Sequence, residues 1–360
     1  MLSSTDFIPQ PYTETIEKGS FSASAPSNIA LVKYWGKKEN QIPANPSLSF
    51  TLKNCKTITH LHFSKIQSTE NFSFELLFEG NPKPSFRPKI ELFFERIAVY
   101  LPFLNEYHFV IDTQNTFPHS SGIASSASGM AALAFNLMSL EKALNPAMSE
   151  DYFYQKASFL ARLGSGSACR SLKGEVVIWG NHAETERSSD LIGIAFESIH
   201  PHFHRYQDTI LLVDKGEKQV SSTVGHELMK QHPFAEKRFE QAHQNLTALK
   251  KILTNGELTG FVQLVESEAL TLHAMMMTSL PYFILMKPNT LEIIQKIWKF
   301  REQTAIPVCF TLDAGANVHV LYPENFRVQV LQFIKNELVV YCQNGQYICD
   351  EIGDGALFLN

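Results

Sequence analysis

The chain has 360 residues, which exceeds the usual size of a single hydrophobic core and predicts two lobes. Hydrophobic residues make up 44% and charged residues 19%, so the chain carries enough apolar material for sizeable cores and is not a disordered segment. Lysine and arginine number 31 against 36 acidic residues, and the net charge of −5 argues against nucleic acid as a partner.

The sequence shows no signal of a membrane or secreted protein. No apolar run approaches the ~20 residues of a membrane-spanning helix. The polar start MLSSTDFIPQ lacks the basic-then-apolar pattern of a signal peptide. The five cysteines form no CxxC pair, and their odd number indicates reduced, mostly buried thiols. We therefore expect a cytoplasmic protein with no membrane partner.

Short runs rich in β-branched and aromatic residues predict strands along the whole chain. These runs are 47–52, 57–63, 107–112, 174–179, 209–213, 306–312 and 317–322. Helices are expected at 127–138, 149–163 and 290–302. Ser149 is the expected N-cap of the second helix, and Asn289 or Thr290 of the third. Because strands and helices do not alternate regularly, a mixed α+β fold is favoured over a doubly wound parallel sheet.

Two segments have the composition of anion-binding loops. In FPHSSGIASSASGMAALAF (117–135), small residues precede an Ala-rich helix, so backbone N–H groups at the helix N-terminus can approach phosphate. The same residues also suit a helix start that is merely tightly packed. In ARLGSGSACRSLKG (161–174), serines and glycines surround Arg170, whose planar fork suits a carboxylate or phosphate. The alternative there is a flexible loop with a surface arginine.

Two further segments and one histidine group carry weaker signals. In APSNIALVKYWGKK (25–38), lysines beside aromatics indicate a pocket for a compact polyanion or a solvated charged turn. In IPVCFTLDAGANVH (306–319), Asp313 ends an apolar strand, where it either caps a turn or acts as a general base. Histidines stand at every second position in 200–204, as metal ligands on one face of a strand can. Pro201 lacks the N–H that strand pairing needs, so we expect neither a regular strand nor a metal site at His200, His202 and His204.

Taken together, these segments resemble the mevalonate diphosphate decarboxylase family. The strings APSNIALVKYWGKK, NPSLSFTL, FPHSSGIASSASG, GSGSACRS and TLDAGAN occur in the family's order, and the resemblance runs from about residue 21 to about residue 325. VSSTVGH (220–226) and SEALTLHAMMMTSLP (267–281) add weaker matches. The family belongs to the superfamily of galactokinase, homoserine kinase and mevalonate kinase (GHMP).

The resemblance implies a two-lobed α+β fold of the GHMP type, with the active site in the cleft between the lobes. Residues 1–200 would form an ATP-binding lobe similar to ribosomal protein S5, and residues 201–360 a GHMP-type lobe. The segment 198–208 is the candidate boundary. The implied reaction is ATP-dependent decarboxylation of mevalonate 5-diphosphate to isopentenyl diphosphate, with CO₂, ADP and phosphate released. Mg²⁺ would accompany ATP, and the family suggests a homodimer.

The resemblance also implies roles for individual residues. Asp313 is expected to act on the C3 hydroxyl. Lys33 is expected to lie near Asp313 or near the transferred phosphate, and Arg170 to face the substrate carboxylate. The other expected substrate-binding residues are Asn28, Tyr34, Lys37, Ser165 and Ser167. The expected ATP-binding residues are Ser120, Ser121, Gly122, Ala124, Ser125 and Ser126.

Three other functions remain open from the sequence. A kinase of the same fold would phosphorylate a mevalonate-like alcohol without decarboxylation, although the run DAGAN (313–317) stands where such kinases carry a Gly-rich loop. A close variant would decarboxylate mevalonate 5-phosphate. A non-catalytic nucleotide-binding scaffold is disfavoured, because it has no need of Lys33, Arg170 and Asp313 together.

Overall fold

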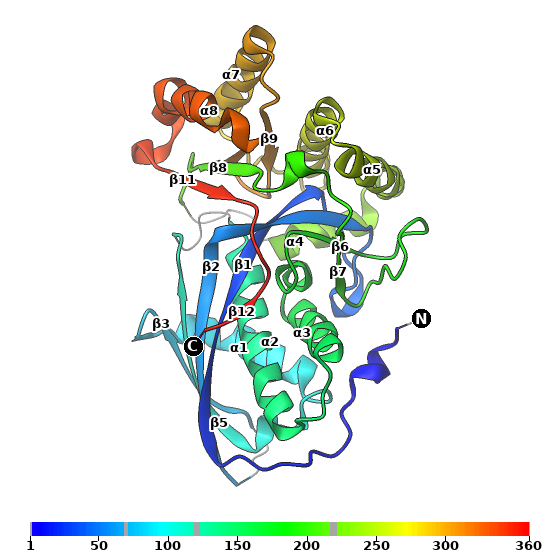
Figure 1. Ribbon diagram of the computed structural model, residues 1–360, viewed down its shortest axis with the longest axis vertical. Helices are drawn as coiled ribbons and strands as arrows, with labels where there is room; N and C mark the ends of the chain where they lie inside the picture. The colour runs from blue at the N-terminus through cyan, green and yellow to red at the C-terminus, as the bar shows by residue number, and fades with distance from the viewer. Residues whose placement is uncertain (1, 68–70, 119–122, 217–221, 360) are drawn as a thin grey trace.

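The computed structural model describes residues 2–67, 71–118, 123–216 and 222–359. Two β-sheets stand one above the other, each with helices packed against it (Figure 1). Helices and antiparallel strands are mixed along the chain, which confirms the expected α+β class. None of the helices in the described ranges is long and apolar enough to cross a membrane.

The first sheet is built around two long antiparallel strands. Its main order is β12-β1-β2-β5-β3-β4, and β6 and β7 extend it from the other end of β2. The strands are β1 (Lys18–Val32), β2 (Ser47–Lys65), β3 (Ser73–Phe78), β4 (Asn81–Pro82), β5 (Tyr107–Asn115), β6 (Val176–Trp179), β7 (Gly193–Ala195) and β12 (Leu357–Phe358). The predicted strands 47–52 and 57–63 are therefore parts of one strand, and β1 was not predicted.

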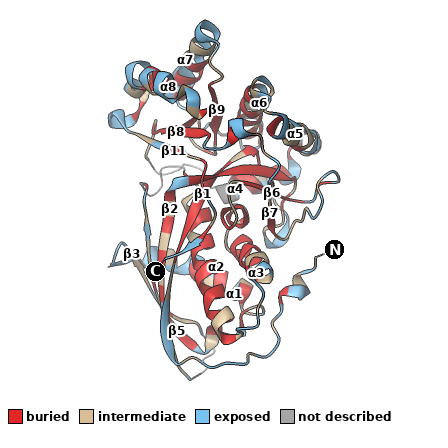
Figure 2. Ribbon diagram, in the orientation of Figure 1, coloured by how far each residue is buried: buried red, intermediate tan, exposed pale blue. Residues whose placement is uncertain are grey.

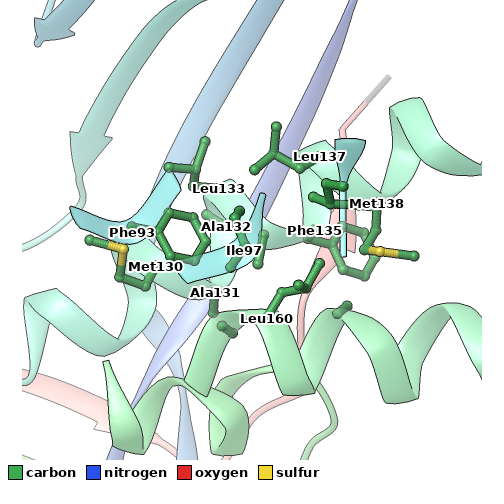
Figure 3. Packing of buried hydrophobic residues seen from close by; sticks show 14 of the residues in the cluster. Phe93, Ile97, Met130, Ala131, Ala132, Leu133, Phe135, Leu137, Met138 and Leu160 are labelled. Carbon is green, nitrogen blue, oxygen red and sulfur yellow. The ribbon is translucent and has the colours of Figure 1, made fainter. Parts of the chain in front are cut away.

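Three helices cover one face of this sheet: α1 (Arg87–Ile97), α2 (Ser125–Leu144) and α3 (Glu150–Gly164). The Ala-rich α2 is buried over most of its length (Figure 2), and its side chains pack between those of α1 and α3 (Figure 3). The predicted helices at 127–138 and 149–163 are confirmed. Ser149 is the N-cap of α3, as expected, and its hydroxyl accepts from the Tyr152 N–H at 3.3 Å.

The second sheet has the order β11-β8-β10-β9 and is antiparallel throughout. Its strands are β8 (Gln207–Leu211), β9 (Cys309–Leu312), β10 (Val318–Tyr322) and β11 (Tyr347–Glu351). Its helices are α4 (Ser222–Glu227), α5 (Ala235–Asn255), α6 (Leu258–Met277), α7 (Pro288–Thr304) and α8 (Arg327–Phe333). The predicted cap of α7 is wrong, because Lys287 is the N-cap and the Thr290 hydroxyl accepts from its N–H.

An apolar core joins the two sheets. The rings of Phe50 on β2 and Phe261 on α6 stack with their centroids 6.0 Å apart, and Tyr206 packs against both. The chain end then returns to the first sheet, where Leu357 pairs with Ser24 of β1. The division at residue 200 stays a prediction. Four of the five cysteines are buried free thiols, as expected, and Cys349 is exposed.

Candidate active site

The end of β1 carries the first group of predicted residues. The register between β1 and β2 shifts between Pro26 and Asn28 and again between Ala30 and Val32. Such bulges redirect side chains and are common beside active sites. Beyond the second shift lies Lys33, which is 2% exposed, whereas Lys37 is half-buried and Lys38 is exposed. The three lysines therefore differ in their access to solvent.

Arg170 is buried and held by two polar side chains from the first sheet. Its Nη1 donates to the Ser47 hydroxyl at 2.6 Å, while Nε and Nη2 donate to Asn28 Oδ1 at 3.3 and 3.2 Å. The guanidinium also lies 5.8 Å from the ring centroid of Trp179. Among the described residues, these hydrogen bonds use three of the five N–H groups of a guanidinium, so the fork is fixed and two donors remain for a ligand. The flexible surface loop considered from the sequence is therefore wrong.

The loop around Arg170 meets the start of α2. Arg170 lies on the short 3₁₀ helix Gly166–Ser171, which follows α3 directly. The hydroxyl of Ser165, at the end of α3, lies 3.3 Å from that of Ser126 in the first turn of α2. Ala124 is the N-cap of α2 and has left-handed backbone angles. The two predicted anion-binding segments are thus neighbours.

Two further serines of these segments, Ser167 and Ser125, lie among the described residues. The backbone carbonyl of Ser167 accepts from the Asn28 side chain at 3.2 Å. Ser125 begins α2. Ser120, Ser121 and Gly122 lie outside the described residues.

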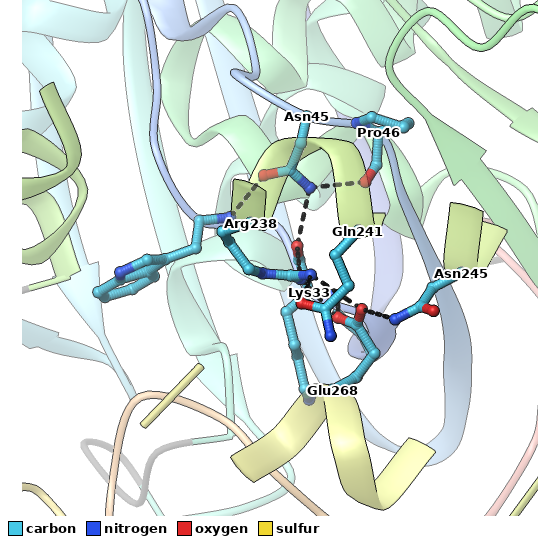
Figure 4. A network of polar contacts seen from close by, with 9 residues as sticks. Lys33, Asn45, Pro46, Arg238, Gln241, Asn245 and Glu268 are labelled. Atoms are coloured by element: carbon cyan, nitrogen blue, oxygen red, sulfur yellow. Dashed lines mark hydrogen bonds and ion pairs between the residues drawn. The ribbon is translucent and has the colours of Figure 1, made fainter. Parts of the chain in front are cut away.

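A buried polar network fixes the backbone of Lys33 (Figure 4). Its N–H donates to Glu268 of α6 at 2.8 Å, and its carbonyl accepts from Asn45 at 2.9 Å and from Arg238 of α5 at 3.2 Å. Arg238 and Glu268 form an ion pair at 2.6 Å, and Asn245 also donates to Glu268. The Lys33 backbone is therefore held by α5, by α6 and by the loop that carries Asn45, while the buried Nε of Arg238 has no hydrogen-bond partner among the described residues.

Lys33 lies within electrostatic range of Asp313 and Arg170. Burial lowers the pKa of Lys33 to about 8, and the charge of Asp313 opposes this shift while that of Arg170 adds to it. Asp313 follows β9, and its backbone carbonyl accepts from His273 Nε2 at 3.1 Å. The three residues that the sequence assigned to catalysis thus lie within electrostatic range of one another, although they come from the beginning, the middle and the end of the chain.

The segment 34–37, which we call the aromatic segment, lies beside this group. The ring of Tyr34 packs edge-on against Trp179 with centroids 4.7 Å apart, and its buried hydroxyl has no hydrogen-bond partner among the described residues. Burial raises the pKa of Tyr34, so the hydroxyl keeps its proton. Gly36 has a φ of 98°, and its N–H donates to His226 Nδ1 at 2.9 Å.

A cavity of about 240 Å³ opens against α2 on the other side of Ser126. Its walls come from α1, α2, β2, β3 and β5, and they include Ser125, Gly129, Asn115 and Lys89. A Cβ atom at Gly129 would meet no other heavy atom within 4 Å, so the helix leaves this space open. The lining is mainly apolar with a few polar groups, as expected of a small-molecule site.

The described residues hold no cluster of three or more His, Cys, Asp or Glu side chains suited to a metal ion. The alternating histidines are bound elsewhere: His200 Nδ1 accepts from the His202 N–H at 3.2 Å, and His204 pairs with Glu175 at 3.0 Å.

Sequence reasoning missed several side chains that shape this site. They are Ser47, Glu268, Arg238, His226 and His273. Ser47, His226, Glu268 and His273 lay within strings already noted for their resemblance, but no local pattern joins these side chains to partners that are 40 to 235 positions away. Their function in the site follows only from contacts across the fold.

Comparison with known proteins shows the family of the chain. Residues 25–190 match the model of the diphosphomevalonate decarboxylase-like N-terminal domain, and residues 209–353 match that of the mevalonate 5-diphosphate decarboxylase C-terminal domain. The diphosphomevalonate decarboxylase of Candida albicans is 30% identical over 329 residues, which cover 88% of this chain and 87% of that protein.

Solved structures give the same result. The mevalonate diphosphate decarboxylase from Staphylococcus aureus has a TM-score of 0.82 at 26% identity, covering 95% of this chain and 98% of its own. MDDEF in complex with MVAPP, AMPPCP and magnesium has a TM-score of 0.79 at 27% identity, covering 94% and 98%. On its sequence, its fold and the residues gathered at its site, the chain belongs to the diphosphomevalonate decarboxylase family.

Proposed function

We propose that this chain catalyses the ATP-dependent decarboxylation of mevalonate 5-diphosphate to isopentenyl diphosphate. The observation that carries the proposal is the meeting of Lys33, Arg170 and Asp313, two buried cations and one carboxylate, beside the start of α2. Relatives that align over most of the chain bear the name diphosphomevalonate decarboxylase. The related MDDEF binds MVAPP, an ATP analogue and magnesium.

The substrate would be held at both of its charged ends. Arg170 keeps two N–H donors beyond those bound to Asn28 and Ser47, which suits the C1 carboxylate. Tyr34 would offer to the diphosphate its hydroxyl, which has no hydrogen-bond partner among the described residues, and Lys37 would offer an ammonium group. The hydroxyls of Ser165 and Ser167 would lie between these groups and the C3 centre.

ATP would place its phosphates at the first turn of α2 and its base in the adjacent cavity. The free N–H groups of a helix start favour phosphate, and Ser125 and Ser126 contribute hydroxyls there. Lys89 lines the same cavity and would provide a positive charge beside the nucleotide. Mg²⁺ is held largely by phosphates and waters, so it needs no carboxylate cluster, and these serine hydroxyls would hold it with ATP.

The chemistry follows from these positions. Asp313 accepts the proton of the C3 hydroxyl. The hydroxyl oxygen then bonds to the γ-phosphorus of ATP, and ADP departs. The C3–O bond then breaks, with both electrons leaving on phosphate. The electron pair of the C1–C2 bond forms the new double bond, and CO₂ is released. Lys33 stabilises the negative charge that develops on the transferred phosphate.

A substrate panel tests the proposal. Purified enzyme with Mg²⁺ and ATP is given mevalonate, mevalonate 5-phosphate or mevalonate 5-diphosphate, and ADP and CO₂ are measured together. We expect equal amounts of both products from the diphosphate alone. ADP without CO₂ would identify a kinase, turnover of the monophosphate a different decarboxylase, and ATP binding without turnover on any compound a scaffold.

Three broader features are proposed on family resemblance. They are a homodimer, which light scattering measures, a cytoplasmic location, which cell fractionation measures, and a lobe boundary near residue 200, which limited proteolysis measures.

A further inference from the structure

His226 makes contacts that neither the sequence motifs nor the proposed chemistry assigns. It lies near the end of α4 and is 8% exposed. Its ring centroid lies 4.3 Å from that of Tyr34 and 4.7 Å from that of Trp35. Its Nδ1 accepts the Gly36 N–H at 2.9 Å. One side chain thus contacts three consecutive residues of the aromatic segment.

The hydrogen bond fixes the protonation state of the ring. An Nδ1 that accepts an N–H carries no proton, so the neutral ring is protonated on Nε2. Burial, together with the nearby charges of Lys37 and Arg170, lowers the pKa of His226 to about 3. The ring therefore stays neutral at physiological pH and keeps its acceptor.

The backbone around the ring leaves little freedom. Gly36 has a φ of 98°, a conformation that few residues other than glycine adopt without strain. A Cβ atom at Gly225 would lie 2.5 Å from Cη2 of Trp35, so α4 approaches the aromatic segment closely because position 225 has no side chain. The two glycines let His226 reach the Gly36 N–H.

We propose that His226 is a positioning residue for the diphosphate end of the substrate. By accepting the Gly36 N–H between the rings of Tyr34 and Trp35, it sets the backbone that carries the Tyr34 hydroxyl and the Lys37 ammonium. The inference rests on the proposed function for the identity of the ligand. The hydrogen bond from the Gly36 N–H to His226, on which the inference is built, does not depend on which reaction the enzyme catalyses.

Two variants separate the hydrogen bond from the packing of the ring. His226→Phe keeps a planar ring between Tyr34 and Trp35 but has no acceptor for Gly36. His226→Asn loses the ring but places Oδ1 where Nδ1 stood. We expect the KM for mevalonate 5-diphosphate to rise about tenfold in the Phe variant, the cost of an unpaired buried donor. The kcat and the KM for ATP should change less than threefold, and the Asn variant should recover most of the lost affinity.

A matched control is His62→Phe, the same replacement at an exposed position of β2. It should leave both KM values unchanged. An unaltered KM in His226→Phe, or an equal loss in the Phe and Asn variants with melting temperatures preserved, would overturn the proposal.

A second measurement is independent of catalysis. Amide hydrogen exchange at Gly36, read by NMR, should be about tenfold faster in His226→Phe than in wild type and close to wild type in His226→Asn. Calorimetric titration with inorganic pyrophosphate should show weaker binding in the Phe variant alone. If the wild-type enzyme turned over no mevalonate compound, the proposed function would fail while these two measurements still decided the role of His226. Unchanged Gly36 exchange in the Phe variant would refute that role.

Discussion

The backbone N–H of Lys33 donates to the Glu268 carboxylate at 2.8 Å, although 235 positions separate the two residues. The same carboxylate pairs with Arg238, so the end of β1 is tied to both α5 and α6. This hydrogen bond is made by the Lys33 backbone, so it positions the residue and does not involve the side-chain ammonium. The ammonium donates to the Ala30 carbonyl at 2.5 Å and lies within electrostatic range of Asp313 and Arg170.

Replacing Glu268 should destabilise the protein. In Glu268→Gln, the amide cannot pair with the charge of Arg238, and its NH₂ group faces N–H donors. A buried ion pair that loses one partner costs about 3–5 kcal/mol, which lowers the melting temperature by roughly 5 °C at this chain length. Glu240→Gln removes an exposed partner of Lys237 and should shift the melting temperature by less than about 1 °C. Equal shifts in calorimetry would contradict the structural role of Glu268.

Asp313 should be essential for turnover. Asp313→Asn keeps the size of the side chain but removes the base, and we expect kcat to fall at least ~10²–10⁴-fold. The measurement is steady-state ADP release from mevalonate 5-diphosphate, with folding checked by circular dichroism. The exposed Asp354→Asn serves as the control and should be fully active. Near-native turnover in Asp313→Asn would remove the carboxylate from the mechanism.

Ser47 and Ser49 provide a matched pair on one strand. Both are fully buried on β2, but only Ser47 binds Arg170, whereas the Ser49 hydroxyl has no hydrogen-bond partner among the described residues. We expect Ser47→Ala to lower kcat/KM for mevalonate 5-diphosphate about tenfold, because a bond to a charged group is lost. Ser49→Ala should stay within about twofold of wild type. Similar kinetics in the two variants would show that the Ser47 contact does not position Arg170.

The pH dependence should report Lys33. Since its pKa is about 8, the ammonium is charged below that pH and neutral above it, and kcat/KM should fall as the pH rises through about 8. Because the arginine of the Lys33→Arg variant stays charged, the remaining kcat/KM of this variant should not fall as the pH rises through about 8. The stability contribution has the opposite sign. The unfolded lysine holds its proton up to 10.5, so the buried charge lowers the stability of the fold below about pH 8, and this cost disappears as the pH rises from about 8 to 10.5. A pH profile that is flat through 8 in wild type would contradict a charged Lys33 in the mechanism.

The cavity beside α2 should hold the nucleotide base. Gly129→Leu directs a side chain into that space, and we expect the KM for ATP to rise at least about tenfold while the KM for mevalonate 5-diphosphate changes little. Gly129→Ala adds one methyl group and is the graded control, with a smaller effect on ATP. If the Leu variant bound ATP normally in calorimetry, the base would lie elsewhere.

Local sequence patterns predicted many of the elements. The strands at 107–112, 209–213 and 317–322 and the helix capped by Ser149 were found because apolar spacing and capping are short-range signals. β1 was missed because its sequence, KGSFSASAPSNIALV, is rich in small and polar residues, and consecutive residues from Ala23 to Ile29 are buried, so no alternation of polar and apolar residues marks it as a strand. The order of the strings that resemble the family predicted the family, and with it Asp313, Lys33 and Arg170 as candidate catalytic residues.

The sequence by itself thus determined the family and the class of fold, and it predicted which side chains carry the chemistry. Only the tertiary structure decided how those side chains are held: Arg170 by Asn28 and Ser47, the Lys33 backbone by Glu268, and Gly36 by His226. The physical reason is distance along the chain. Capping and periodicity act within a few residues, whereas each of these hydrogen bonds joins segments that become neighbours only when the sheets and helices pack.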